Sequence, residues 1–185
     1  MFIQTEDTPN PETLKFMPGE SVLKKGTHDF SNEDIAKISP LASRLFEVDG
    51  VSRVFLGSDF VSVTKNIDVE WNNLKPSILT AIMEHYSSGF PAINEDSLDN
   101  SGESSVDDTE TITQIKDLLE TRVRPAVAMD GGDITFCSFE DGIVTLKMQG
   151  ACAGCPSSTA TLKMGIENML RHYIPEVTEV KAAEL

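Results

Sequence analysis

Cysteine and basic residues are scarce in this sequence, and long apolar runs are absent from it. The 185 residues include three cysteines and three histidines, and 15 Lys and Arg stand against 30 Asp and Glu, which gives a formal net charge of −15. Affinity for phosphate backbones and anionic lipid surfaces comes from clustered Lys and Arg, so this balance argues against nucleic acid and membranes as partners. No apolar run approaches the roughly 18 residues that a membrane-spanning helix needs.

The three cysteines also indicate a compartment. An odd number of cysteines fits a disulfide framework poorly, and the opening MFIQTED is too acidic and too poor in apolar residues for a signal or transit peptide. We therefore expect a reducing environment, the cytoplasm, in which a Cys-x-x-Cys pair is more often a metal or redox site than a structural staple.

Residues 94–109 divide the chain. Their sequence, NEDSLDNSGESSVDDT, is dominated by Asp, Glu, Ser, Asn and Gly, and such a segment cannot bury enough apolar surface to offset its chain entropy. A long surface loop within one domain is the alternative, but structureless loops of this length are uncommon inside compact domains. We expect an α+β fold class, in which two small α+β domains at 1–93 and 110–185 are joined by a flexible acidic linker at 94–109.

The first domain shows short apolar alternations and two helical segments. Strands are expected at 13–17, 51–55 and 60–64. Ser39 and Pro40 indicate a helix start, and a second helix opening near residue 72 should turn four side chains inward, Leu74, Ile78, Ile82 and Met83. This domain has no cysteine, and its histidines, His28 and His85, are expected to face solvent.

The second domain predicts the order helix, strand, strand, cysteine loop, helix, strand. Helical spacing from Ile112 to Val123 should end at Arg124-Pro125, because proline terminates helices. A turn at 129–133, whose glycines can take positive φ, leads into strands at 133–139 and 143–149 joined by Asp141-Gly142, a hairpin signal. A helix follows the cysteines and ends before Pro175, and a short strand is expected at 177–180.

The chemistry is concentrated in QGACAGCPSST, residues 149–159, between that second strand and the helix. Two intervening residues, one of them glycine, allow Cys152 and Cys155 to turn both sulfurs toward one centre. The positive end of the following helix favours thiolates and should lower the pKa of both cysteines. They should be ligating or reactive.

Three chemistries suit such a pair. A structural zinc ion needs four ligands, and the additional candidates are weak: Cys137 is expected to be a packed or half-buried bystander, and His172 suits the helix C-terminus as a cation. Thiol–disulfide exchange is supported by the order strand, Cys-x-x-Cys, helix, although the preceding tight hairpin and the Ala-Gly spacer differ from the thioredoxin class. An iron–sulfur cluster generally takes four thiolates, so two copies of the chain would complete its ligand set and could surrender it on separating.

Two segments carry a family resemblance. The sequence MDGGDI at 129–134, with the later GACAGCPSS at 150–158, resembles the C-terminal domain of NifU and the Nfu-type iron–sulfur scaffold and carrier proteins. The opening IQTEDTPNPETLKFMPG, residues 3–19, resembles the N-terminal domain of the Nfu proteins. Together the resemblance covers nearly the whole chain except the acidic linker.

The resemblance implies a homodimer that shares a [4Fe–4S] cluster, with [2Fe–2S] less favoured, through Cys152 and Cys155 of each protomer. It implies an upstream assembly scaffold as donor, apo-proteins as recipients, and a first domain that engages recipients. Cys137 is not part of the family's motif. The absence of a mitochondrial presequence favours a bacterial form, or an organellar matrix protein if the chain is a processed form. We expect a carrier and not an enzyme, since the sequence offers no general acid/base pair and no nucleophile with a base.

Overall fold

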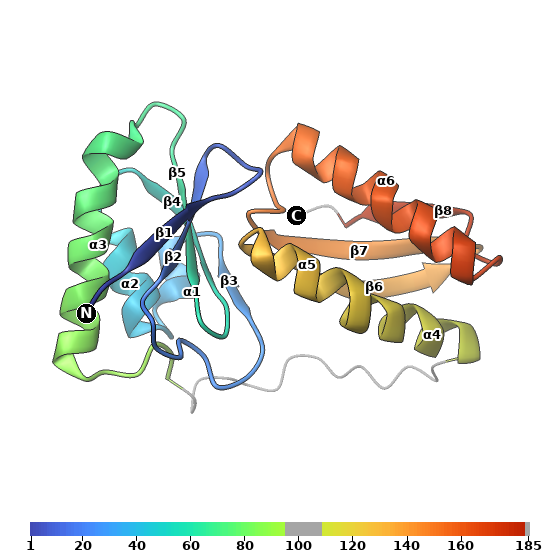
Figure 1. Ribbon diagram of the computed structural model, residues 1–185, viewed down its shortest axis with the longest axis horizontal. Helices are drawn as coiled ribbons and strands as arrows, with labels where there is room; N and C mark the ends of the chain where they lie inside the picture. Colours follow the sequence, from blue (N-terminus) through green and yellow to red (C-terminus); the bar gives the residue numbers. More distant parts are fainter. Residues whose placement is uncertain (95–108, 184–185) are drawn as a thin grey trace. The chain divides into compact units, whose positions relative to one another are not determined.

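The computed structural model describes residues 1–94 and 109–183, and these residues form two compact units (Figure 1). Each unit packs helices against a sheet with little interleaving of strands and helices, which confirms the α+β fold class in two domains. The predicted linker lies, apart from its end residues Asn94 and Thr109, outside the described residues.

The first unit is built on a five-stranded antiparallel sheet in the order β1-β2-β5-β4-β3. The three strands predicted from alternation are confirmed, and each of their ends lies within one residue of the predicted position. Strands β1 and β3 were not predicted, because they are only four and three residues long and largely polar. The strands are β1 (Gln4–Asp7), β2 (Thr13–Met17), β3 (His28–Phe30), β4 (Val51–Leu56) and β5 (Val61–Lys65).

Three helices cover the sheet of the first unit: α1 (Glu33–Ala36), α2 (Pro40–Phe46) and α3 (Trp71–Ser88). The predicted start of α2 is confirmed, because the Ser39 hydroxyl accepts a hydrogen bond from the Ala42 N–H at 3.0 Å while Pro40 occupies the first helical position. Apolar residues of α2, α3, β2, β4 and β5 share one core.

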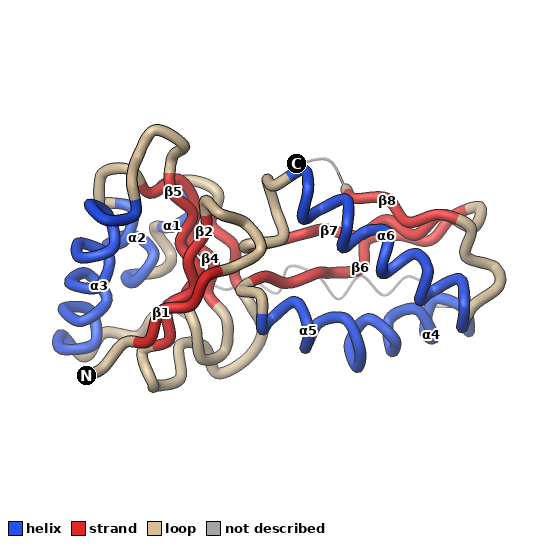
Figure 2. Tube along the Cα trace, turned by 45° about the horizontal axis from the view of Figure 1, so that its top comes forward, coloured by secondary structure: helices blue, strands red, loops and turns tan. Residues whose placement is uncertain are grey.

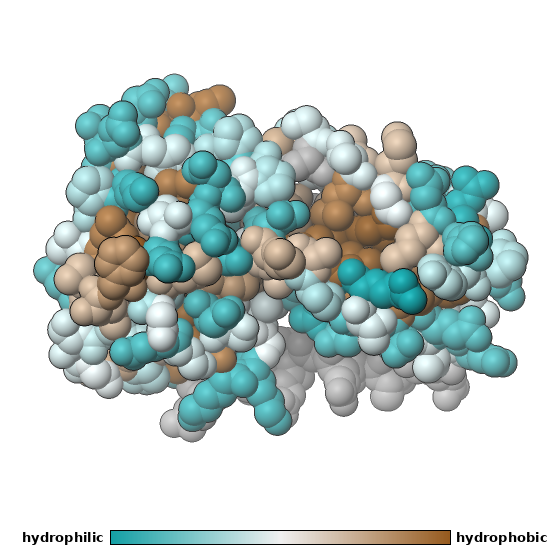
Figure 3. Space-filling model, in the orientation of Figure 1, coloured by the Kyte–Doolittle hydropathy of each residue, from teal (hydrophilic) through white to brown (hydrophobic). Residues whose placement is uncertain are grey.

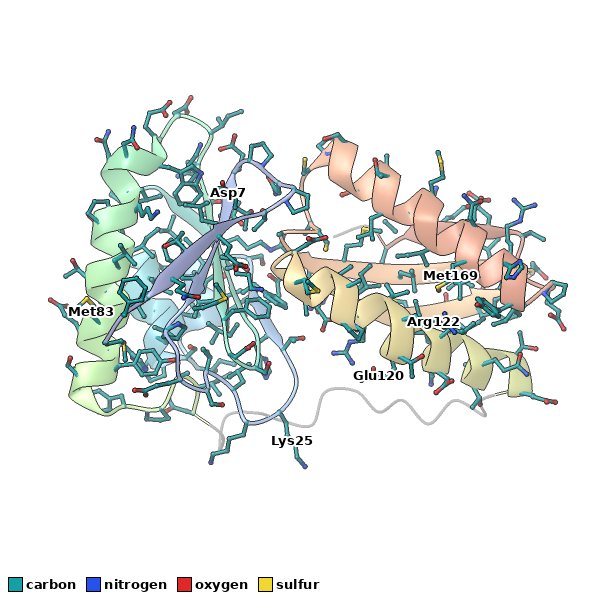
Figure 4. All side chains as sticks on the ribbon, viewed as in Figure 1. Asp7, Lys25, Met83, Glu120, Arg122 and Met169 are labelled. Carbon is teal, nitrogen blue, oxygen red and sulfur yellow. The ribbon has the colours of Figure 1, made fainter. Side chains whose placement is uncertain are left out.

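Two predictions for α3 are wrong. Met83 is 45 % exposed and points away from the sheet (Figure 4), whereas His85 is 1 % exposed. At about 100° per residue, position 83 lies on the opposite side of the helix from Leu74, and position 85 lies about 20° from it. Burial lowers the pKa of His85, so this histidine is a neutral core residue at pH 7.

The second unit has a three-stranded sheet in the order β6-β7-β8, in which β7 pairs antiparallel with β6 and parallel with β8. Apolar side chains of α4, η2, α5 and α6 form one core with side chains of the three strands. The helices therefore cover one face of this sheet (Figure 2). The elements are α4 (Glu110–Leu118), the π-helical segment η2 (Leu119–Val123), α5 (Arg124–Met129), β6 (Gly132–Glu140), β7 (Ile143–Gly150), α6 (Pro156–Tyr173) and β8 (Glu179–Ala182).

The prediction that Arg124-Pro125 ends the first helix of this unit is wrong. Pro125 lacks an N–H and its ring would clash with the carbonyl four residues earlier in a regular α-helix. The chain avoids this conflict by widening one turn, in which the Arg124 N–H bonds to the carbonyl of Leu119, five residues back. Proline then stands in the first turn of α5, where no N–H is needed.

The hairpin between β6 and β7 is confirmed at the predicted residues. Asp141 and Gly142 have φ of 49° and 77°, the conformation of a two-residue turn that suits strand twist. A Cβ atom at position 142 would lie 2.8 Å from the Thr178 hydroxyl oxygen and 2.9 Å from the Glu176 carbonyl oxygen. This turn therefore needs glycine for its φ and for its close contacts.

Replacing Gly142 by alanine should cost more than the φ penalty alone. In the metal-free protein, placing alanine in the left-handed conformation should lower the unfolding free energy by about 1 kcal/mol. The contacts of the added Cβ with Thr178 and Glu176 should raise this loss to at least about 2 kcal/mol. Gly154→Ala is the matched control, since Gly154 has φ of 80° but nothing within 4 Å of the added Cβ. Urea unfolding followed by circular dichroism measures both, and equal losses would contradict the steric argument.

Candidate functional site

The two predicted ligands, Cys152 and Cys155, lie in the loop between the end of β7 and the start of α6. Gly150 and Gly154 turn this loop, with φ of 62° and 80°. The loop is tied to α6 by Thr159, whose hydroxyl donates to the Cys152 carbonyl at 3.0 Å and whose N–H donates to the Cys155 carbonyl at 2.9 Å. Both thiols thus sit on a short segment that is fixed to the helix behind it.

The two thiols have different surroundings. Cys152 is 5 % exposed and belongs to the apolar core of the second unit, whereas Cys155 is half-buried and its Sγ lies 3.4 Å from the Ser157 Oγ. Burial, with a further contribution from the charges of Asp130 and Asp133, raises the pKa of Cys152 to about 12. The prediction that the helix N-terminus lowers both cysteine pKa values is therefore wrong for Cys152, because desolvation and two carboxylates favour the protonated thiol.

The turn before β6, which contains Gly131 and Gly132, packs against Cys152. Gly131 has φ of 79°, and its carbonyl accepts a hydrogen bond from the Ala151 N–H at 3.2 Å. Gly132 stands opposite Gly150 in the β6–β7 ladder, and a Cβ atom there would lie 2.5 Å from the Cys152 Sγ and 2.8 Å from the Gln149 carbonyl oxygen. Positive φ was the predicted reason for glycine at both positions, but at 132 the reason is the close approach of the Cys152 sulfur.

An ion pair that was not predicted from the sequence anchors this turn. Arg124 donates from Nε and Nη2 to Oδ1 and Oδ2 of Asp133, both at 2.8 Å, and from Nη1 to Glu120 Oε2 at 2.6 Å. The hydrogen bonds to Asp133 raise the pKa of Arg124 further above its ordinary value. No spacing rule in the sequence connects Asp133 to an arginine nine residues earlier.

The remaining zinc candidates are not brought to the loop. Cys137 is exposed, so the prediction that it is packed or half-buried is wrong. It is the extra residue of a bulge, since the ladder passes from Phe136 opposite Leu146 to Ser138 opposite Thr145. His172 is exposed near the end of α6, and within residues 1–94 and 109–183 no three His, Cys, Asp or Glu side chains are grouped to hold a metal ion.

The apolar core of the second unit reaches the surface beside the helices. Figure 3 shows apolar side chains gathered on this unit between the positions of α5 and α6 in Figure 1. Among the large apolar side chains with more than 60 % exposure in this unit are Met129 at the end of α5 and Met164 on α6.

No helix in the described part of the chain combines the length and apolar character needed to cross a membrane.

The cysteines should differ in their reaction rates with iodoacetamide. In the metal-free protein we expect Cys137 to be alkylated at least tenfold faster than Cys152, because the Cys152 thiol is buried and its pKa is raised, and only the thiolate attacks. Timed labelling followed by peptide mass spectrometry gives the rates. In urea the two rates should converge, and equal rates in the folded protein would contradict the burial of Cys152.

Comparisons with known proteins agree over both units. The family described as "Scaffold protein Nfu/NifU N terminal" matches residues 3–89, and the "NifU-like domain" matches residues 115–181. The proteins named NifU-like protein 4 and NifU-like protein 5, mitochondrial, of Arabidopsis thaliana are each 55 % identical to this chain over 185 aligned positions. The alignments cover 98 % of this chain and 65 % and 67 % of the two relatives. The NFU1 iron-sulfur cluster scaffold homolog, mitochondrial, of Drosophila ananassae is 53 % identical over 182 residues, covering 98 % of this chain and 64 % of its own. The chain thus spans about two thirds of the length of these curated relatives.

Proposed function

Because this chain belongs to the Nfu/NifU family of scaffold proteins, we propose that it binds an iron–sulfur cluster and carries it to apo-proteins. The relatives' names support an iron–sulfur scaffold. We further propose that the cluster is a [4Fe–4S] cluster, that two protomers hold it through Cys152 and Cys155 of each, and that the protein is a carrier and not an enzyme.

The shortage of ligands carries this proposal. One loop supplies two thiols, and the described residues offer no further grouped donors, whereas a [4Fe–4S] cluster takes four thiolates. Two loops from two copies supply the four. Iron binding must displace the proton of Cys152, so loading a cluster releases protons to solvent.

Release follows from the same arrangement. Each cluster is held by two short loops from two chains, and Cys155 is only half-buried, so an incoming thiolate of a recipient can exchange with it. The net charge of −15 steers the carrier toward basic surfaces on recipients. The first unit engages these recipients, and an upstream assembly scaffold supplies the cluster.

The alternative, thiol–disulfide exchange, is less well supported. An attacking cysteine needs a substantial thiolate fraction near pH 7, whereas burial and two carboxylates raise the pKa of Cys152 to about 12. Cys155 alone could attack, but its resolving partner would be this buried thiol.

The location of the protein is a separate proposal. The mitochondrial names of the relatives fit the organellar matrix, and the bacterial cytoplasm is proposed beside it.

Cluster transfer tests the proposed function. Protein reconstituted without oxygen is mixed with an apo-dehydratase whose activity needs a [4Fe–4S] cluster, in the presence of a chelator that removes free iron. We expect activity to return at least tenfold faster than with equal free iron and sulfide, because the cluster passes directly between thiolates. Recovery no faster than with free iron and sulfide, or rapid reduction of insulin disulfides by the metal-free protein, would contradict the carrier function.

A further inference from the structure

We propose that Arg124 is a positioning residue for the cluster: through its ion pair with Asp133 it holds the turn beneath Cys152 and neutralises a carboxylate beside the cluster. This inference rests on the proposed function and extends it to residues outside the Cys-x-x-Cys loop. It predicts that the pair controls both how long the cluster is retained and its reduction potential.

The position of Arg124 follows from the widened helical turn. Pro125 imposes the π-helical segment η2, and Arg124 is the first residue after it. Glu120, labelled in Figure 4, lies on this segment and accepts from Arg124 Nη1 at 2.6 Å. The guanidinium is thus held from one side by Glu120, and its Nε and Nη2 edge is left directed at Asp133.

Asp133 is bound more completely than a turn residue requires. Its side chain is 4 % exposed, and its two carboxylate oxygens accept the two parallel hydrogen bonds from Arg124. Oδ1 also accepts from the Ile134 N–H at 2.8 Å. A buried carboxylate bound in this fork geometry fixes the start of β6, because moving the strand would break several charge-assisted hydrogen bonds together.

The start of β6, which the ion pair fixes, also packs against Cys152. Gly132 immediately precedes Asp133, and a Cβ atom at Gly132 would come within 2.5 Å of the Cys152 Sγ, so the turn and the sulfur are in close contact. The charge of Asp133 acts on the Cys152 thiol. A displacement of Asp133 would therefore move the surface against which the ligand packs.

The charge of the pair matters once iron is bound. Four thiolates around a [4Fe–4S]²⁺ core leave a net negative charge, and one-electron reduction makes it more negative, so nearby carboxylates disfavour reduction. Arg124 offsets Asp133 on each protomer. Removing the arginine exposes the cluster to the carboxylate, and removing the carboxylate exposes it to the arginine, so the two changes should shift the potential in opposite directions.

Four variants of the full-length chain test the proposal: Arg124→Met, Arg124→Lys, Asp133→Asn and, as control, Arg171→Met. Arg171 pairs only weakly with Glu167 at 3.8 Å and lies about 24 Å along α6 from Cys155. Each variant is reconstituted, and three quantities are measured: urea stability without metal, the rate of cluster loss to a chelator, and the reduction potential.

We expect Arg124→Met to lose its cluster about tenfold faster than wild type and to have a lower potential, while Asp133→Asn has a higher potential. Arg124→Lys keeps the charge but not the fork, so its potential should return toward wild type while retention stays reduced. Arg171→Met should match wild type in both. A merely structural role would change stability without opposite shifts in potential.

The contrary outcomes are distinct. A wild-type chain that takes up no cluster would contradict the proposed function, and this inference with it. Normal loading of wild type, with Arg124→Met and Asp133→Asn shifted in the same direction or unshifted, would overturn the inference alone. If Arg124→Met does not fold, Arg124→Lys and Asp133→Asn still decide: equal potentials in these two variants would overturn it.

Discussion

We expect Cys155→Ser to abolish both cluster binding and the pairing of two chains. Under the proposed function each protomer supplies two of the four thiolates, and serine oxygen is a poor replacement for thiolate at iron, so iron per chain should fall from about two to near zero. The metal-free variant should remain as stable as wild type, because Cys155 is only half-buried at the entrance to α6. Iron analysis, visible absorbance and mass in solution measure the three effects.

Two further variants sharpen this test. Cys152→Ser should also lose cluster and pairing, but at a cost of about 1–3 kcal/mol in unfolding free energy, because it places a hydroxyl in the apolar core. Cys137→Ser is the matched control, since Cys137 is exposed on the bulge of β6, and it should keep colour and pairing. A paired, iron-loaded Cys155→Ser, or a colourless Cys137→Ser, would show that the ligands have been assigned wrongly.

Gly132→Ala should damage both the fold of the second unit and its site. The added Cβ would meet the Cys152 Sγ at 2.5 Å, the Gln149 carbonyl oxygen at 2.8 Å and the Cys152 nitrogen at 3.0 Å, and two of these atoms belong to the backbone. Relief requires the cysteine loop to move away from β6, so we expect a loss of about 3 kcal/mol in unfolding free energy. Cluster occupancy should fall by at least half.

The control for Gly132→Ala is the same substitution at Gly165. Gly165 lies inside α6 with nothing within 4 Å of an added Cβ, so alanine there should stabilise the helix by up to about 1 kcal/mol. Urea unfolding of the metal-free proteins and iron content after reconstitution give the comparison. Gly132→Ala with wild-type stability and a full cluster would mean that the turn does not support Cys152 as described.

Features set by neighbouring residues were predictable from the sequence. The hairpin at Asp141-Gly142 and the helix start at Ser39-Pro40 are local arrangements, since each depends on backbone preferences of two or three adjacent residues. Strands β1 and β3 could not be found in this way. Their short polar sequences become strands because β2 and β4 offer edges to pair with.

In the candidate site, too, the features set by neighbouring residues were predictable and those set by tertiary contacts were not. The Cys-x-x-Cys pair identified the loop, but the helix dipole was a local argument, and the burial that raises the pKa of Cys152 comes from the packed core. Proline at 125 was correctly seen as incompatible with a regular helix. That the chain would widen a turn and direct Arg124 to Asp133 depends on tertiary contacts that no spacing in the sequence encodes.

The central claim is that each chain brings half of a ligand set, and native mass spectrometry of the reconstituted protein tests it most directly. Samples are prepared without oxygen and without glutathione or other small thiols, and iron and acid-labile sulfide are assayed in parallel. The expected species contains two chains with four irons and four sulfides, and metal-free chains remain single. A complete cluster carried by one chain would contradict the claim.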